Sequence, residues 1–84
     1  MNYYVYILEN KKGILYKGYT VNLPKRLWQH NNNSKFSSYT HKNGVWKLVY
    51  YEIFTDIINA KKREKYFETG KGRNKLKLIL HMPG

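Results

Sequence analysis

A single carboxylate interrupts an apolar stripe in the second half of the sequence. The stripe consists of Ile57, Ala60, Glu64 and Phe67, at the i, i+3, i+7, i+10 spacing of one side of an α-helix. An unpaired charge is costly to bury, so a glutamate in such a stripe pairs with a base, lies at a cleft edge or binds a metal. A structural ion pair and a boundary position that reaches solvent stay open. Glu64 is therefore a candidate catalytic residue and metal ligand.

A second candidate pair lies in the first half of the chain. Arg26 and His30 are four residues apart, so they occupy one face of a helix if this segment is helical. A guanidinium can hold a phosphate bidentately and offset the negative charge that develops during phosphodiester cleavage, and an imidazole can hold or move a proton. An exposed Arg and His on a basic helix would be ordinary surface residues, and this alternative stays open.

Two short tyrosine motifs near the N-terminus are also candidates. If residues 11–13 form a three-residue hairpin loop, Tyr6 pairs opposite Gly18 and Tyr16 lies on the same face of the sheet. Gly18 could then allow a backbone or a phosphate to approach, or mark a bulge or a tight core contact. The two phenols could do chemistry, or they could be packing residues, as tyrosines in strands commonly are.

The elements that position these candidates begin with a hairpin and a helix. Residues 3–8 are aromatic and β-branched on both alternating faces, which predicts a central strand covered on both sides. Residues 14–20 continue as its antiparallel partner. Thr20 and Asn22 are both possible caps for a helix over about residues 23–30, with Leu23 and Leu27 facing inward and Pro24 in the first turn.

The second half supplies a third strand and two helices. Residues 46–54 have strong β character, Asp56 can cap a helix that runs through Glu68, and Gly70 is expected to terminate it. A last helix is expected over about residues 73–80. The predicted fold is α+β, with order ββαβαα and a three-stranded antiparallel sheet flanked by helices. We expect one domain over residues 1–84, because a chain this short has room for one core.

Composition points to a nucleic-acid partner. The formal charge is +11, which favours polyanions, and the aromatic content of 17% supplies stacking surfaces. Excess lysine for solubility is the alternative. A membrane-surface protein would need an amphipathic helix richer in bulky apolar residues. The chain has no cysteine, which excludes a disulfide-linked partner and thiolate chemistry, and its start does not read as a signal peptide, so we expect a cytoplasmic protein.

These features occur in the order found in the GIY-YIG endonuclease domain, which the sequence resembles over nearly its full length. The chain looks especially similar to small stand-alone members related to the nuclease domain of the excinuclease C subunit, a DNA-repair enzyme. The matching motifs are Tyr4-Val5-Tyr6, Tyr16-Lys17-Gly18, Asn22-Leu23-x-x-Arg26-Leu27 and Ala60-x-x-x-Glu64. Each motif is weak alone, and their joint order and spacing are the signal.

The resemblance implies a hydrolytic endonuclease that cuts phosphodiester bonds in DNA with one Mg²⁺ or Mn²⁺ ion. Glu64 would hold the metal, Arg26 would bind the phosphate, and Tyr6 or Tyr16 would assist deprotonation of the attacking water. His30 matches an accessory active-site position in some relatives. Tyr4 stands where the family has its name-giving glycine. Asn74 only approximates the spacing of a supporting asparagine, so it is not assigned to the site.

Substrate binding would use the basic surface. The candidate nucleic-acid-binding residues are Lys17, Gly18, Lys25, Lys35 and Lys42, with Phe36 and Tyr39 available for stacking on bases. Nothing in this set encodes sequence readout, so we expect recognition of DNA structure rather than sequence, by a monomer. The competing hypothesis is a catalytically silent nucleic-acid-binding module on the same scaffold.

Overall fold

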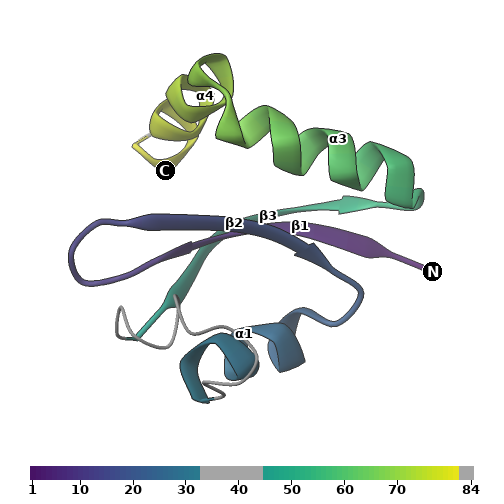
Figure 1. Ribbon diagram of the computed structural model, residues 1–84, viewed down its shortest axis with the longest axis horizontal. Helices are drawn as coiled ribbons and strands as arrows, with labels where there is room; N and C mark the ends of the chain where they lie inside the picture. The colour runs from purple at the N-terminus through teal and green to yellow at the C-terminus, as the bar shows by residue number, and fades with distance from the viewer. Residues whose placement is uncertain (33–44, 82–84) are drawn as a thin grey trace.

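A computed structural model of the chain describes residues 1–32 and 45–81. The elements follow the order ββαβαα, as the sequence predicted. They are β1 (Tyr3–Glu9), β2 (Leu15–Thr20), α1 (Leu23–Asn32), β3 (Lys47–Phe54), α3 (Ile57–Glu68) and α4 (Gly70–Leu80). In the ribbon view α1 lies on one face of the sheet, and α3 and α4 lie on the other (Figure 1).

The sheet is antiparallel throughout, with strand order β2-β1-β3. Val5, Tyr6, Ile7 and Leu8 of the central strand are all buried, because their side chains point alternately into the two layers. Val5 and Ile7 pack under α3 and α4, and Tyr6 and Leu8 pack with residues of α1. The prediction of a central strand covered on both faces is confirmed. In the described part of the chain, no helix has the length and apolar character to cross a membrane.

The hairpin between β1 and β2 sets the register of the site. Gly13 has φ +80°, a left-handed conformation that glycine adopts without strain. The Asn10 side chain accepts backbone hydrogen bonds from Lys12 and Ile14 at 3.0 and 2.9 Å and so holds the turn. Tyr6 consequently pairs with Gly18, in the register that a three-residue loop predicted.

Helix α1 begins after Asn22, whose side chain accepts the Lys25 amide at 3.2 Å. Of the two caps that the sequence left open, Asn22 is therefore the N-cap. The helix continues to Asn32, two residues beyond the predicted end. Asn31 explains why this last turn is ordered: its side-chain amide donates to the Trp46 carbonyl at 3.0 Å and accepts the Trp46 amide at 2.7 Å. The end of α1 is thus fixed to the start of β3.

Helix α3 is capped by Asp56, which accepts the Ile58 amide at 2.8 Å, and it ends at Glu68 as predicted. The prediction that Gly70 terminates it is wrong. Thr69 is the C-cap of α3 and also the N-cap of α4, because its hydroxyl accepts the Gly72 amide at 3.1 Å. Helix α4 therefore begins at Gly70 rather than near residue 73. A Cβ on Gly72 would lie 1.8 Å from the Tyr66 carbonyl oxygen, so this tight helix-to-helix turn requires glycine there.

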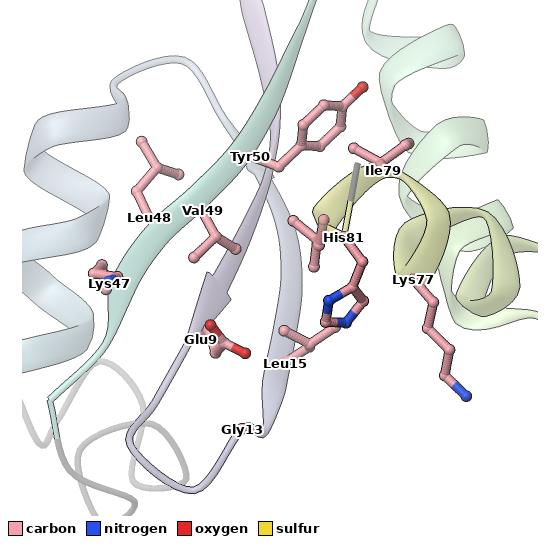
Figure 2. A pocket seen from close by; sticks show the side chains of 11 residues that line it. Glu9, Gly13, Leu15, Lys47, Leu48, Val49, Tyr50, Lys77, Ile79 and His81 are labelled. Atoms are coloured by element: carbon pink, nitrogen blue, oxygen red, sulfur yellow. The ribbon is translucent and has the colours of Figure 1, made fainter. Parts of the chain in front are cut away.

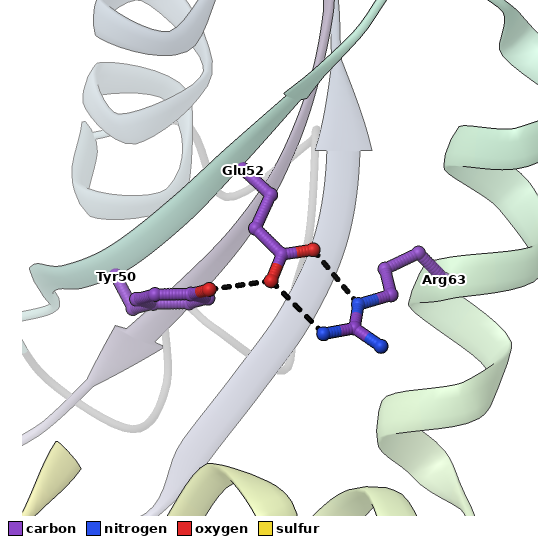
Figure 3. Close-up of polar contacts among 3 residues, drawn as sticks. All are labelled: Tyr50, Glu52 and Arg63. Atoms are coloured by element: carbon purple, nitrogen blue, oxygen red, sulfur yellow. Dashed lines mark hydrogen bonds and ion pairs between the residues drawn. The ribbon is translucent and has the colours of Figure 1, made fainter. Parts of the chain in front are cut away.

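A polar cluster ties α3 to β3 (Figure 3). Glu52 on β3 accepts two hydrogen bonds from the Arg63 guanidinium, at 2.8 Å from Nε and 3.0 Å from Nη2. The Tyr50 hydroxyl donates to the same carboxylate. The guanidinium carbon lies 4.6 Å from the centroid of the Phe67 ring, so it also contacts the core. This bidentate contact fixes the helix that carries Glu64.

Candidate active site

Four of the five candidate catalytic residues, Tyr6, Tyr16, Arg26 and Glu64, meet in one pocket at the outer edge of β2. The pocket has a volume of about 290 Å³. Its lining comes from β1, β2, α1 and α3, and consists of Tyr6, Tyr16, Lys17, Gly18, Tyr19, Arg26 and Glu64. Because β2 is an edge strand, groups from both layers of the protein can reach this position. Arg26 arrives from the α1 side of the sheet and Glu64 from the α3 side.

Gly18 is required by the position of the Tyr6 side chain. A Cβ on Gly18 would lie 2.6 Å from the Tyr6 hydroxyl oxygen and 2.7 Å from the ring carbon that bears it. Both distances are shorter than a non-bonded contact allows. Of the alternatives that the sequence left open for this glycine, the structure shows a tight side-chain contact. The missing side chain lets the Tyr6 ring extend over β2 and line the pocket.

His30 lies beneath the two phenols and is fully buried. The Tyr6 hydroxyl and His30 Nε2 are 2.8 Å apart, a hydrogen bond, and the Tyr16 and His30 ring centroids are 4.7 Å apart. Burial, and then the charge of Arg26, lowers the pKa of His30 to about 4. The imidazole is therefore neutral at pH 7 and can accept the Tyr6 hydroxyl proton. The alternative that His30 is an ordinary exposed residue is wrong.

The pocket brings the cationic side chains of Lys17 and Arg26 together with the Glu64 carboxylate. Burial raises the pKa of Glu64, and the carboxylate of Glu68 one helical turn away raises it further. Burial likewise raises the pKa of Tyr6 and Tyr16; Glu64 adds to the increase at both phenols and Arg26 opposes it. Both phenols are thus protonated at pH 7. Burial is the largest cause of the raised pKa at each phenol, and the charges of Arg26 and Glu64 modify it in opposite directions.

The donor set at Glu64 fits a hard divalent cation. The carboxylates of Glu64 and Glu68 lie one helical turn apart and repel each other, and a bound cation would reduce this repulsion. Mg²⁺ and Mn²⁺ prefer oxygen ligands such as a carboxylate. Among residues 1–32 and 45–81, no three His, Cys, Asp or Glu side chains come together as a ready-made metal cage. A cation here would therefore rely on water and phosphate oxygens for most of its ligands.

The other predicted site residues lie around or outside this pocket. Lys17 and Gly18 line it. Lys25 lines a neighbouring hollow that also contains Arg26. Lys35 and Lys42, with Phe36 and Tyr39, fall outside the described residues. Tyr4, at the position of the family glycine, lies in the apolar layer against Tyr51, with ring centroids 6.0 Å apart, and does not line the pocket.

Sequence reasoning missed several residues around Glu64. Tyr19 lines the pocket from β2, and a hollow on the α3 side is lined by Lys61, Lys62 and Lys65 together with Tyr19 and Glu64. The signal was available for the lysines, because their positions at i, i+1 and i+4 adjoin the Glu64 stripe on the helix. It was not available for Tyr19, which reaches the pocket only through the placement of α3 beside β2.

A larger hollow of about 610 Å³ lies elsewhere, between the hairpin end of the sheet and the end of α4. Its lining is mixed: Figure 2 shows aliphatic side chains such as Leu48, Val49 and Ile79 beside the titratable side chains of Glu9, Lys47, Tyr50, Lys77 and His81. None of the candidate catalytic residues lines it. Size alone therefore does not select the candidate active site. The smaller pocket at β2 is the one that brings a carboxylate, a guanidinium and two phenols together.

Comparison with known proteins agrees with this geometry. The UPF0213 protein of Clostridium perfringens is 45% identical over 76 residues, which span 90% of this chain and 81% of that protein. The UPF0213 protein of Syntrophus aciditrophicus is 39% identical over 80 residues, covering 95% and 92% of the two chains. The solution NMR structure of a UPF0213 protein from Bacillus halodurans is similar with a TM-score of 0.57 and 32% identity, covering 94% of this chain and 85% of that one.

The match to a known domain is nearly as long as the chain. Residues 2–77 match the GIY-YIG catalytic domain, a range that contains Tyr6, Tyr16, Arg26, His30 and Glu64. These are also the residues that the fold gathers at the edge of β2. The resemblance stated from the motifs is confirmed, and the chain belongs to the GIY-YIG nuclease family.

Proposed function

We propose that this protein is a divalent-metal-dependent endonuclease that hydrolyses phosphodiester bonds in DNA and recognises DNA structure rather than sequence. The observation that carries the proposal is the convergence of Arg26, Glu64 and two tyrosines on one pocket from four different elements. A phosphodiester needs a cation for its non-bridging oxygens and a group that orients the attacking water. This pocket offers both within about 290 Å³.

Arg26 is the phosphate-binding residue in this proposal. A guanidinium can donate two parallel hydrogen bonds to phosphate oxygens. The net charge of +11 draws the polyanion toward the protein, and Arg26 then fixes one phosphate in the pocket. Negative charge that develops on this phosphate during attack is stabilised by the same guanidinium.

The two phenols hold the attacking water. Each is protonated at pH 7, so each hydroxyl can both accept and donate a hydrogen bond to water. His30 is a positioning residue, because its neutral Nε2 fixes the direction of the Tyr6 hydroxyl at 2.8 Å. Tyr16 is less buried than Tyr6 and packs against the edge of the same imidazole. A phenol that accepts the proton of the attacking water gives up its own proton in the same step; for Tyr6 the acceptor of that proton is His30 Nε2, 2.8 Å away.

Glu64 would hold the single Mg²⁺ or Mn²⁺ ion. When bound, the cation would polarise the scissile phosphate, stabilise the leaving oxygen and cancel the carboxylate charge that raises the pKa of both phenols. Glu64 itself provides the oxygen ligand, and α3 holds it in place through the Arg63 contact to Glu52.

The decisive experiment compares wild type, Glu64→Gln and Glu9→Gln on nicked, flapped, single-stranded and duplex DNA, with matching RNA. Each is assayed with Mg²⁺, with Mn²⁺ and with chelator. Glu9→Gln is the matched control, because it makes the same change outside the pocket. We expect cleavage of DNA by wild type and by the control, and a loss of at least about 100-fold in Glu64→Gln or in chelator.

Two outcomes would contradict the proposal. Cleavage that persists in Glu64→Gln and in chelator would overturn the assignment of Glu64 and of the metal. Tight binding of every substrate by wild type, without cleavage of any, would identify the protein as a silent nucleic-acid-binding module on this scaffold.

A further inference from the structure

Two further hollows adjoin the catalytic pocket along the edge of β2. One has a volume of about 480 Å³ and shares Tyr19 and Glu64 with the pocket. The other has a volume of about 290 Å³ and shares Arg26 with it. The pocket therefore lies between a hollow beside α3 and a hollow beside the start of α1.

The hollow on the α3 side is strongly basic. Lys61, Lys62 and Lys65 line it, and all three side chains are exposed. The exposed Ile58 and the partly buried Tyr19 also line the hollow and form its apolar floor, beside the three lysines. These α3 residues follow the i, i+3, i+4, i+7 spacing of one helix face, which lies beside the buried face that contains Ala60 and Phe67.

Three ammonium groups within two helical turns repel one another, which is unfavourable in the free protein. Within the described residues Glu64 is the acidic group that lines this hollow, and its charge belongs to the catalytic pocket as well. A bound polyanion would remove the repulsion. The apolar floor and the adjacent cations together match a sugar-phosphate chain, which presents charged phosphates and less polar sugar and base faces side by side.

We propose that this hollow, the lysine subsite formed by Tyr19, Ile58, Lys61, Lys62 and Lys65, binds the nucleic-acid strand directly beside the bond that is cut. The proposal rests on the proposed function, because it places the scissile phosphate in the neighbouring pocket. The lysines hold the flanking phosphates, and Ile58 and Tyr19 contact the sugar or base between them. The subsite thereby fixes the direction in which the strand leaves the pocket toward α3.

The test compares two triple variants that carry the same net charge. The subsite variant is Lys61→Gln/Lys62→Gln/Lys65→Gln. The control variant is Lys11→Gln/Lys12→Gln/Lys71→Gln, whose lysines are exposed and line neither the pocket nor the two hollows beside it. Glutamine preserves helix propensity, so both variants are expected to fold. The probe is a fluorescein-labelled single-stranded DNA oligonucleotide in chelator, and its affinity is measured by anisotropy over a range of salt concentrations.

The slope of log affinity against log salt reports how many phosphates are neutralised. We expect the slope of the subsite variant to be smaller than that of wild type by about 2, which corresponds to loss of three phosphate contacts on a single strand. The control variant should keep the wild-type slope. Equal slopes in the two variants would overturn the subsite, because the lysines would then act only through net charge.

Cleavage by the wild type separates this proposal from the proposed function. If wild type cuts DNA and the two variants bind with equal slopes, the nuclease assignment stands and the subsite is wrong. If wild type does not cut but the subsite variant alone shows the smaller slope, the subsite stands as a binding site and the nuclease proposal is wrong.

Discussion

Two neighbours fix the position of the Tyr6 ring. Gly18 has no side chain and so leaves room for the ring, and the buried imidazole of His30 forms a hydrogen bond with its hydroxyl. Each contact has a measurable consequence. Burial and the charge of Arg26 favour the neutral imidazole, so protonation of His30 opposes folding. The glycine leaves no space for even one methyl group, so a minimal substitution displaces the phenol that lines the pocket.

The pH dependence of stability should reveal His30. Its pKa is about 4 in the folded protein and about 6.5 when unfolded, so the unfolded chain binds more protons between these values. The free energy of unfolding is therefore highest, as far as His30 is concerned, above pH 6.5, and it decreases as the pH falls from 6.5 toward 4. Between pH 7 and pH 5 we expect a loss of about 2 kcal/mol in the free energy of unfolding.

Urea unfolding of wild type and His30→Gln at both pH values measures this loss. Glutamine can still accept the Tyr6 hydroxyl proton but does not titrate, so the variant should lack this part of the pH dependence. The carboxylates titrate alike in both proteins. An identical pH dependence in the two proteins would contradict the buried, neutral state of His30.

Gly18→Ala should displace the Tyr6 side chain. The added methyl group would lie 2.6 Å from the hydroxyl oxygen, so we expect a loss of about 1 to 3 kcal/mol in unfolding free energy and slower cleavage. Gly70→Ala is the matched control, since a Cβ there meets nothing within 4 Å and its backbone is not left-handed. That variant should be as stable as wild type or slightly more stable in the same urea titration. Equal losses in both would refute the steric argument.

Sequence reasoning reached part of this arrangement. The hairpin loop length and the alternation of side chains were enough to pair Tyr6 with Gly18, because strand geometry is local and periodic. The same spacing rules placed Arg26 and His30 on one helix face but could not say how that face meets the sheet. The structure turns His30 fully inward and leaves Arg26 at the pocket. That difference depends on how α1 packs, which no local pattern records.

At the scale of elements, the contact between Glu52 and Arg63 adds a polar link between α3 and β3 to the core packing of Ala60 and Phe67. Hydrogen bonds from Arg63 and Tyr50 outweigh the effect of burial and lower the pKa of Glu52. In Arg63→Met the carboxylate would keep its partly buried position without its cation. We expect a loss of about 1 to 3 kcal/mol in unfolding free energy, less than for a fully buried pair, since both side chains retain some exposure.

A double-mutant cycle tests this contact. Adding Glu52→Leu to Arg63→Met removes both partners, so it should recover most of the lost stability. Lys62→Met is the matched control on the exposed face of the same helix, and we expect it to change stability by less than about 0.5 kcal/mol. If the stability changes of Arg63→Met and Glu52→Leu simply added in the double variant, the contact between these two side chains would not stabilise the packing of α3 on the sheet.

The ends of elements were predicted less well than their existence. The pattern of Asp56 followed by an apolar stripe located α3 correctly, since an N-cap is a local signal. The junction between α3 and α4 was misassigned because glycine after a helix commonly terminates it. Here Thr69 caps both helices, and the glycine that matters is Gly72, which must approach the Tyr66 carbonyl. Only the packing of one helix against the other reveals that requirement.

At the scale of the whole molecule, a charge of +11 is confined to a body with a Cα radius of gyration of 12.7 Å. This self-repulsion opposes folding, and a bound polyanion removes it. A single-stranded oligonucleotide at about 100 times its dissociation constant should therefore add about 2.7 kcal/mol to the free energy of unfolding. For a chain of this size we expect the melting temperature to rise by about 10 °C or more.

The melting experiment also separates binding from catalysis. In chelator, Glu64→Gln should show the full increase in melting temperature, because the positive field does not depend on that carboxylate. Raising the salt concentration from about 50 to 200 mM should abolish most of the increase, since phosphate contacts release counterions. An increase that survives high salt would mean that apolar contacts, rather than the basic surface, bind the strand. The absence of any increase at low salt would contradict a nucleic-acid partner altogether.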